Sequence, residues 1–196
     1  MMVLIVGLIL FLGIHLLPTQ PELRDGLRER IGAGPYRILF GALSFAGLVV
    51  IILGFHKLQI NPGKNPVLWD PPVWTRHIAV TLMLPAIILF VASLIPSRIR
   101  TVTRHPMLIA IKIWALAHLL ANGDLASLLL FGSFLAFAVF DRISLKQRAA
   151  LSPPAPAKPV SALNDVAVVV AGAALYAWLL MGGHQWLIGV APIPLG

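Results

Sequence analysis

The chain has 196 residues, a net charge of +8 and no cysteine, and it is 59% hydrophobic and only 11% charged. Soluble domains are about 45–50% apolar and about 25% charged, so this composition excludes an ordinary soluble domain. Because cysteine is missing from the sequence, disulfides, thiolate metal ligands, iron–sulfur clusters and haem attached through a C-x-x-C-H motif are also excluded.

Six apolar runs follow one another along the chain, at about 2–17, 35–55, 75–96, 105–121, 125–141 and 163–182. Each run is near the length that crosses the hydrocarbon core at about 1.5 Å per residue. Backbone groups in lipid need internal partners, and the runs lack the alternating polar residues of barrel strands. The sequence therefore predicts an all-α integral membrane bundle of about six transmembrane helices with short loops.

The first run has no Lys or Arg before it and no A-x-A-like site after it, so we expect no cleaved signal peptide. A proline-rich stretch, Leu151 to Pro159, is the clearest linker pattern. The predicted organisation is a five-helix core over 1–145, a cytoplasmic linker over 146–161, and a sixth helix with a short tail over 162–196. Between the fourth and fifth runs, Asn122, Gly123 and Asp124 predict a tight outer turn, in which Gly123 permits positive φ.

Basic residues indicate the orientation of this bundle. Eleven of the fifteen Lys and Arg lie in three alternate connections, three lie in the other two, and Lys112 lies within a run. The excess marks the cytoplasmic side, which predicts a bacterial inner-membrane protein with both termini periplasmic. The positive charge therefore reflects membrane topology, and we expect the lipid bilayer, and no nucleic acid, as a partner.

Two of the six histidines stand out because they lie inside apolar runs. His15 and His118 are each about thirteen residues from the start of their run, so roughly 20 Å of helix rise places them deep in the bilayer. An ionisable group in hydrocarbon is costly and suggests function; a neutral imidazole bonded to a neighbouring helix is the alternative. Since their helices are antiparallel, we expect them to differ in depth by roughly 10 Å, which suits opposite faces of a tilted porphyrin.

Other polar residues near the membrane have simpler interpretations. His56, His77 and His184 are expected at outer helix ends, and His105 is expected to cap a helix that begins at Pro106. Lys112 lies mid-run on nearly the same face as His105; it either snorkels or pairs with a carboxylate or a cofactor propionate. Asp141 and Arg142 are expected to form an interfacial pair or a cap.

Several motifs in this chain resemble those of NnrU-type membrane proteins and the related 15-cis-zeta-carotene isomerases. The resemblance runs from His15 to Arg142. It includes Leu23-Arg24, Ile31-Gly32, Tyr36-Arg37, His56, Thr103-Arg104-His105-Pro106, Trp114 to His118, Asn122-Gly123 and Asp141-Arg142.

The resemblance implies an integral-membrane haem b protein whose axial ligands are His15 and His118, with His56 also implicated in function. Its role would be isomerase-like, or a redox or sensing role associated with denitrification. Arg37, Arg104 and Lys112 are candidate partners of the haem propionates, and His105 lies in the same set of candidate cofactor residues. One position departs from the isomerase, since Ala115 stands where the isomerase has a cysteine.

Two other functions remain open. The Arg104-His105-Pro106 motif followed by a helix and Asn122-Gly123 also resembles S-adenosylmethionine-dependent membrane methyltransferases. Alternatively, the chain is a non-enzymatic accessory or assembly subunit of a respiratory complex. The expected partner is accordingly either a hydrophobic small molecule or a respiratory-chain protein.

Overall fold

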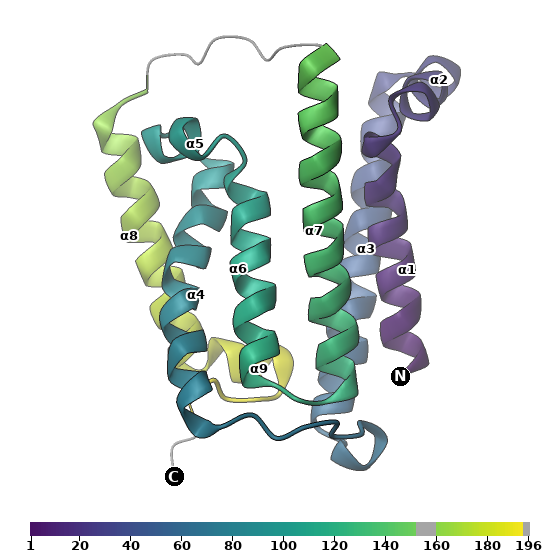
Figure 1. Ribbon diagram of the computed structural model, residues 1–196. Helices are drawn as coiled ribbons and strands as arrows, with labels where there is room; N and C mark the ends of the chain where they lie inside the picture. Colours follow the sequence, from purple (N-terminus) through teal and green to yellow (C-terminus); the bar gives the residue numbers. More distant parts are fainter. Residues whose placement is uncertain (152–159, 194–196) are drawn as a thin grey trace. The chain divides into compact units, whose positions relative to one another are not determined.

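The computed structural model describes residues 1–151 and 160–193, and within them the chain is helical with short connections (Figure 1). The predicted all-α fold is confirmed. In chain order the helices are α1 (Met2–Leu16), α2 (Pro21–Ile31), α3 (Ala33–Gln59), α4 (Val73–Leu94), α5 (Arg98–Thr103), α6 (Pro106–Ala121), α7 (Leu125–Leu151), α8 (Ala162–Trp178) and α9 (His184–Ile188).

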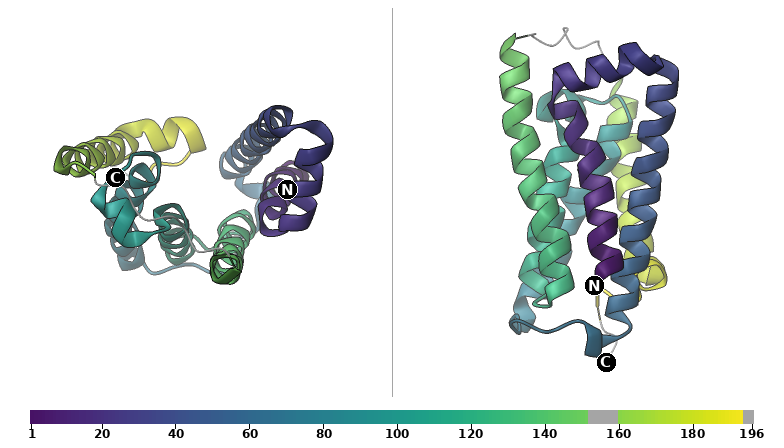
Figure 2. Two further views of the ribbon diagram at one scale, coloured as in Figure 1. Left: turned by 90° about the horizontal axis from the view of Figure 1, so that it is seen from above. Right: turned by 90° about the vertical axis from the view of Figure 1, so that its right-hand side faces the viewer.

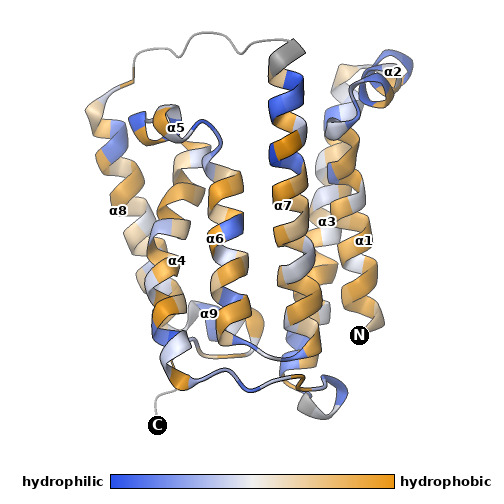
Figure 3. Ribbon diagram, viewed as in Figure 1, coloured by the Kyte–Doolittle hydropathy of each residue, from blue (hydrophilic) through white to orange (hydrophobic). Residues whose placement is uncertain are grey.

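Five of the described segments are long and apolar enough to cross a bilayer, namely Met2–Thr19, Ala33–Gln59, Val73–Leu94, Leu125–Ala149 and Ala162–Ile188. Helix α6 is apolar but has only 16 residues, so it rises about 24 Å. Hydrophobic residues dominate these helices, whereas α2 and the C-terminal part of α7 are hydrophilic (Figure 3). The chain is a multi-pass membrane protein, as its composition predicts.

The helices form two compact units, Met1–Asn65 and Pro66–Gly196. In the first unit, α1 and α3 pack closely because glycines stand at their contacts. A Cβ added to Gly7 would lie 2.7 Å from the backbone nitrogen of Ile51, and one added to Gly47 would lie 2.9 Å from that of Phe11. Small residues at such contacts let membrane helices approach closely, since burial from water does not drive their association.

The second unit is a curved row of helices in the order α8, α4, α6, α7 (Figure 2). Helix α8 is fixed to α4 by side chains along its length. Tyr176 donates a hydrogen bond to the carbonyl of Val80 at 3.0 Å, and a Cβ on Gly172 would lie 2.8 Å from Ile88. At the other end, Asp165 accepts a hydrogen bond from the backbone N–H of Arg98 at 2.7 Å.

Two local features differ in detail from what the sequence predicts. Gly123 is not among the glycines with positive φ; its backbone instead lies against the carbonyl of Trp69, which leaves no room for a side chain. The carbonyl of Gly123 accepts the N–H of Leu68 at 2.8 Å, so this turn pairs with the preceding loop. Asp141 pairs with Arg148 at 3.1 Å, because α7 continues as a helix well past Arg142.

The boundary of the predicted linker differs from the structure in one respect. Residues 146–151 belong to the end of α7, since the helix extends to Leu151. The proline-rich part, residues 152–159, lies outside the described residues. The first predicted connection also contains structure, because the basic segment Pro21–Ile31 forms α2, where Asp25 accepts two hydrogen bonds from Arg24.

Candidate functional site

His118 lies near the C-terminal end of α6, in an aromatic environment. Its ring stacks on Phe131 with centroids 4.4 Å apart, and Trp114 is 5.5 Å away on the preceding turn. Trp114 in turn makes edge contacts with Phe131 and Phe134 of α7. These contacts between α6 and α7 fix the position of the imidazole within the apolar part of the second unit.

The hydrogen bond of His118 defines which ring nitrogen carries the proton. Nδ1 lies 2.8 Å from the carbonyl oxygen of Trp114. Because a carbonyl can only accept, Nδ1–H is the donor, and the neutral ring keeps its lone pair on Nε2. This is the arrangement found in histidines that ligate metals through Nε2, whose second nitrogen bonds a carbonyl or carboxylate.

A second imidazole lies close to His118 in the same unit. The ring centroids of His118 and His184 are 6.3 Å apart and their planes differ by 19°. His184 follows a kink at Leu179–Gly183, where Gly182 has φ +130°. The sequence predicts His184 at an outer helix end, and the structure places it beside His118, near the C-terminal end of α6.

His15 repeats the features of His118 within the first unit. Its Nδ1 lies 2.7 Å from the carbonyl oxygen of Phe11, four residues earlier. Its ring stacks on that of Phe11 at 4.2 Å and meets Phe40 of α3 edge-on at 5.3 Å. His15 is the second-to-last residue of α1, so it lies nearer the helix end than the sequence suggests. His56, in the same unit, is partly buried near the end of α3.

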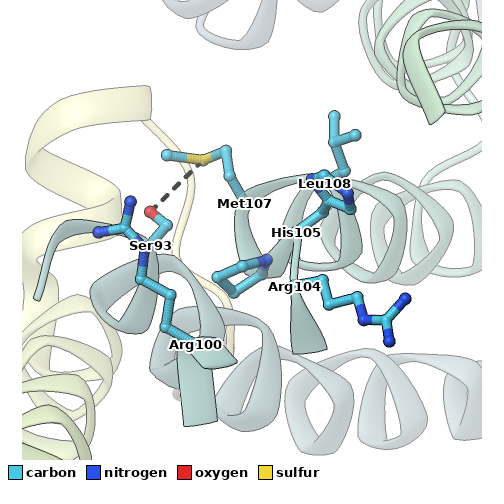
Figure 4. A pocket seen from close by; sticks show the side chains of 7 residues that line it. Ser93, Arg100, Arg104, His105, Met107 and Leu108 are labelled. Carbon is cyan, nitrogen blue, oxygen red and sulfur yellow. Dashed lines mark hydrogen bonds between the residues drawn. The ribbon is translucent and has the colours of Figure 1, made fainter. Parts of the chain in front are cut away.

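His105 lines a small cavity where α5 meets α6. The cavity has a volume of about 180 Å³ and is lined by Ser93, Arg100, Arg104, His105, Pro106, Met107 and Leu108. Arg100 extends toward Ser93, whereas Arg104 points in another direction (Figure 4). As predicted, His105 is the N-cap residue of α6 and Pro106 its first residue, although the His105 side chain makes no cap hydrogen bond.

Positive charge surrounds His105. Burial lowers the pKa of His105 from its usual value, and the nearby guanidinium groups of Arg142 and Arg104 lower it further, while Asp141 opposes them. Arg104 is also the one non-glycine residue with positive φ among the described residues, at 60°. The turn between α5 and α6 is therefore strained and electropositive.

The remaining predicted residues are scattered. Arg37 is exposed near the start of α3, and Lys112 is partly buried in the middle of α6. Neither has a carboxylate within 4.0 Å among residues 1–151 and 160–193. The same residues contain no group of three or more His, Asp and Glu side chains arranged to hold a metal ion. The clearest cluster of candidate ligands is therefore the pair His118 and His184.

The fold and this histidine site define a multi-pass helical membrane protein with partly buried imidazoles near the ends of its helices. The NnrU protein family model matches residues 3–192, nearly the whole chain. The chain belongs to the NnrU family. No curated protein and no solved structure matches it.

Proposed function

We propose that this NnrU protein binds haem b in the membrane, with His118 as an axial ligand to the iron. The supporting observation is the hydrogen bond from Nδ1 of His118 to the carbonyl of Trp114, which leaves Nε2 as the basic nitrogen. The aromatic rings of Phe131 and Trp114 around it supply the apolar surroundings that a porphyrin needs.

The side chains around His118 are of the types that would hold a haem group. A porphyrin supplies four nitrogens to its iron, so the protein has to provide at most two axial ligands, and neutral imidazoles are common ones. The sequence resemblance implies His15 as the second ligand. In its own unit His15 has the same backbone hydrogen bond and the same stacked aromatic neighbour as His118. The propionates would pair with cations, for which Lys112, Arg104 and Arg37 are the candidates.

A redox role suits this site better than isomerisation. Haem held by imidazoles such as that of His118 would supply one-electron chemistry. The position equivalent to the isomerase cysteine is Ala115, which is fully buried and offers no ligand that could exchange with His118. The chain's own part is to fix the imidazole, to exclude water with aromatic side chains and to stabilise the propionates. We therefore propose an electron-transfer function, whose association with denitrification is what the sequence resemblance implies.

Haem content tests the proposal. The protein is produced in haem-replete cells, purified in detergent, and compared with His118→Ala and with His77→Ala as a control, because His77 is exposed on α4. We expect His118→Ala to lose most of its haem and His77→Ala to keep a full complement. Equal haem content in all three proteins, at equal helical content by circular dichroism, would rule out His118 as a ligand.

The cavity beside His105 is where the alternative function, an S-adenosylmethionine-dependent methyltransferase, would need its binding site. Its volume of about 180 Å³ is below the roughly 300–1,000 Å³ of typical small-molecule sites, so it favours a smaller ligand than S-adenosylmethionine. Calorimetric titration of the purified protein with S-adenosylmethionine tests this alternative directly. A role as an accessory subunit predicts that a respiratory-complex protein co-purifies with wild-type protein and with His118→Ala alike.

A further inference from the structure

The connection between α4 and α6 carries two arginines that the described chain does not neutralise. Arg100 and Arg104 both line the cavity at the junction of α5 and α6, and both are exposed. Among residues 1–151 and 160–193, neither guanidinium has a carboxylate within 4.0 Å, whereas the neighbouring Arg98 lies 3.8 Å from Asp165. The residues that line the cavity include no Asp or Glu. The cavity is therefore electropositive and suits an anion.

The start of α6 adds hydrogen-bond donors on the same side. His105, the N-cap residue, makes no side-chain cap hydrogen bond to the first N–H groups of the helix. Because Pro106 has no N–H, the first of these groups belong to Met107 and Leu108, which both line the cavity. Such N–H groups carry partial positive charge and bind phosphate in many proteins. The hydroxyl of Ser93 is already donated within its own helix, so the guanidiniums and the helix start are the main donors.

The cavity has room for a small anion. Its volume of about 180 Å³ corresponds to roughly six water molecules at about 30 Å³ each, which accommodates a phosphate group. The planar fork of a guanidinium matches the oxygens of a phosphate. Arg100 and Arg104 extend in different directions (Figure 4), and because both side chains are exposed, each is able to rotate onto a ligand.

The short length of α6 brings this cavity toward the lipid headgroups. Its 16 residues rise about 24 Å, which is less than the roughly 30 Å of the hydrocarbon core. The residues that flank the helix are therefore drawn toward the boundary of the hydrocarbon. Apolar side chains are exposed in the same connection, since Leu94 is 63% exposed and Val102 is 81% exposed. Exposed apolar and cationic side chains together are suited to contact with an anionic lipid.

We propose that this cavity binds a phosphate group, held by Arg100 and Arg104 at the start of α6. A lipid headgroup and a free phosphate ion present the same chemical group, and the shortness of α6 favours the lipid. Basic pockets between membrane helices bind anionic headgroups in this way. The site goes beyond the proposed haem function, because it lies at the opposite end of α6 from His118 and needs no iron.

The test measures how ligands shift the thermal unfolding midpoint of the purified protein in detergent, followed by tryptophan fluorescence. The ligands are dioctanoyl phosphatidylglycerol, dioctanoylglycerol, which has the same acyl chains without the phosphate, and sodium phosphate against sodium chloride at equal ionic strength. The proteins are wild-type, Arg100→Gln, Arg104→Gln and Arg76→Gln. Arg76 is the matched control, because it is also exposed but lies at the other end of α4 from Ser93.

We expect phosphatidylglycerol to raise the midpoint of wild-type and Arg76→Gln alike, because a ligand that binds only the folded state stabilises it. Arg100→Gln and Arg104→Gln should each need about tenfold more lipid for the same increase, since each loses a charge-assisted hydrogen bond to the phosphate. Each shift is taken from the ligand-free midpoint of the same variant, so a difference in basal stability does not affect the comparison.

The two sources of phosphate give different results. If phosphatidylglycerol alone raises the midpoint, the ligand is a lipid; if sodium phosphate also raises it and the two cavity variants lose that response, the site accepts the free ion. An equal increase with dioctanoylglycerol would overturn the inference, because acyl chains would then account for binding. Equal responses of wild-type, Arg100→Gln and Arg104→Gln would overturn it as well, and so would the absence of any response of wild-type to both phosphate ligands.

Discussion

Gly54 of α3 lies directly against Leu4 of α1: a Cβ at Gly54 would be 2.6 Å from the backbone nitrogen of Leu4 and 2.8 Å from its Cα. Leu4 is fully buried at this contact. Because the opposing atoms belong to the backbone, a methyl group cannot be accommodated by a side-chain rotation, and the two helices have to move apart.

Gly54→Ala should therefore destabilise the first unit, although alanine is normally the better helix former. Overpacking of this kind costs about 1–3 kcal/mol, which is measured as the change in the free energy of unfolding in mixed detergent micelles. Gly41→Ala, on the same helix with open space around its Cβ, is the control and should be neutral or slightly stabilising. Equal stabilities for the two variants would show that α1 and α3 do not pack at this distance.

Asp165 connects the start of α8 to the N-terminus of α5. It accepts the N–H of Arg98 at 2.7 Å and lies 3.8 Å from the guanidinium of the same residue. Asp165→Asn should lower stability by about 1 kcal/mol, because it removes a charge-assisted hydrogen bond at a helix N-terminus. Asp70→Asn, at an exposed loop position, is the control. If both substitutions leave the unfolding midpoint unchanged, Asp165 does not hold α8 in place.

His105 should make stability depend on pH. Burial and the neighbouring cations lower its pKa in the folded protein, whereas the unfolded chain has the ordinary value near about 6.5. As pH falls below about 6.5, the unfolded state binds a proton that the folded state resists, so stability decreases until the folded-state pKa is reached. His105→Gln should reduce the loss of thermal stability between pH 7.5 and pH 5.5. An identical loss in wild-type and variant would contradict the shift.

The orientation of the chain can be tested directly because the sequence contains no cysteine. The distribution of basic residues predicts that the segment containing Glu29 is cytoplasmic and that the loop containing Lys64 is outside. Both residues are exposed. A membrane-impermeant maleimide added to intact spheroplasts should label Lys64→Cys and not Glu29→Cys, with both labelled after lysis. The reverse pattern would place the termini in the cytoplasm.

The helical architecture could be predicted from hydropathy, because span length and composition in lipid allow few alternatives. The first and last predicted runs, 2–17 and 163–182, coincide closely with α1 and with α8 and its kinked extension. Helix α2 could not be found this way, since its residues are mostly polar and it is held by its own ion pairs and by the helix it touches.

The candidate site was only partly predictable. His118 could be identified from sequence because it interrupts an apolar run, and its local hydrogen bond follows from its own helix. His184 could not be linked to it, since their contact depends on the packing of α8 against α4 and on the backbone at Gly182. The consecutive glycines Gly182 and Gly183, just before a histidine, were the available signal for a kink at that point.

The most direct test of the central claim is the absorption spectrum of the purified wild-type protein, recorded with its reduced pyridine haemochrome. Production in cells supplied with a haem precursor prevents low occupancy from limiting the result. Haem binding predicts a Soret band, a haemochrome of b type and close to one haem per chain. A folded, monodisperse protein from the same cells with no Soret band, and none after incubation with haemin, would contradict the account.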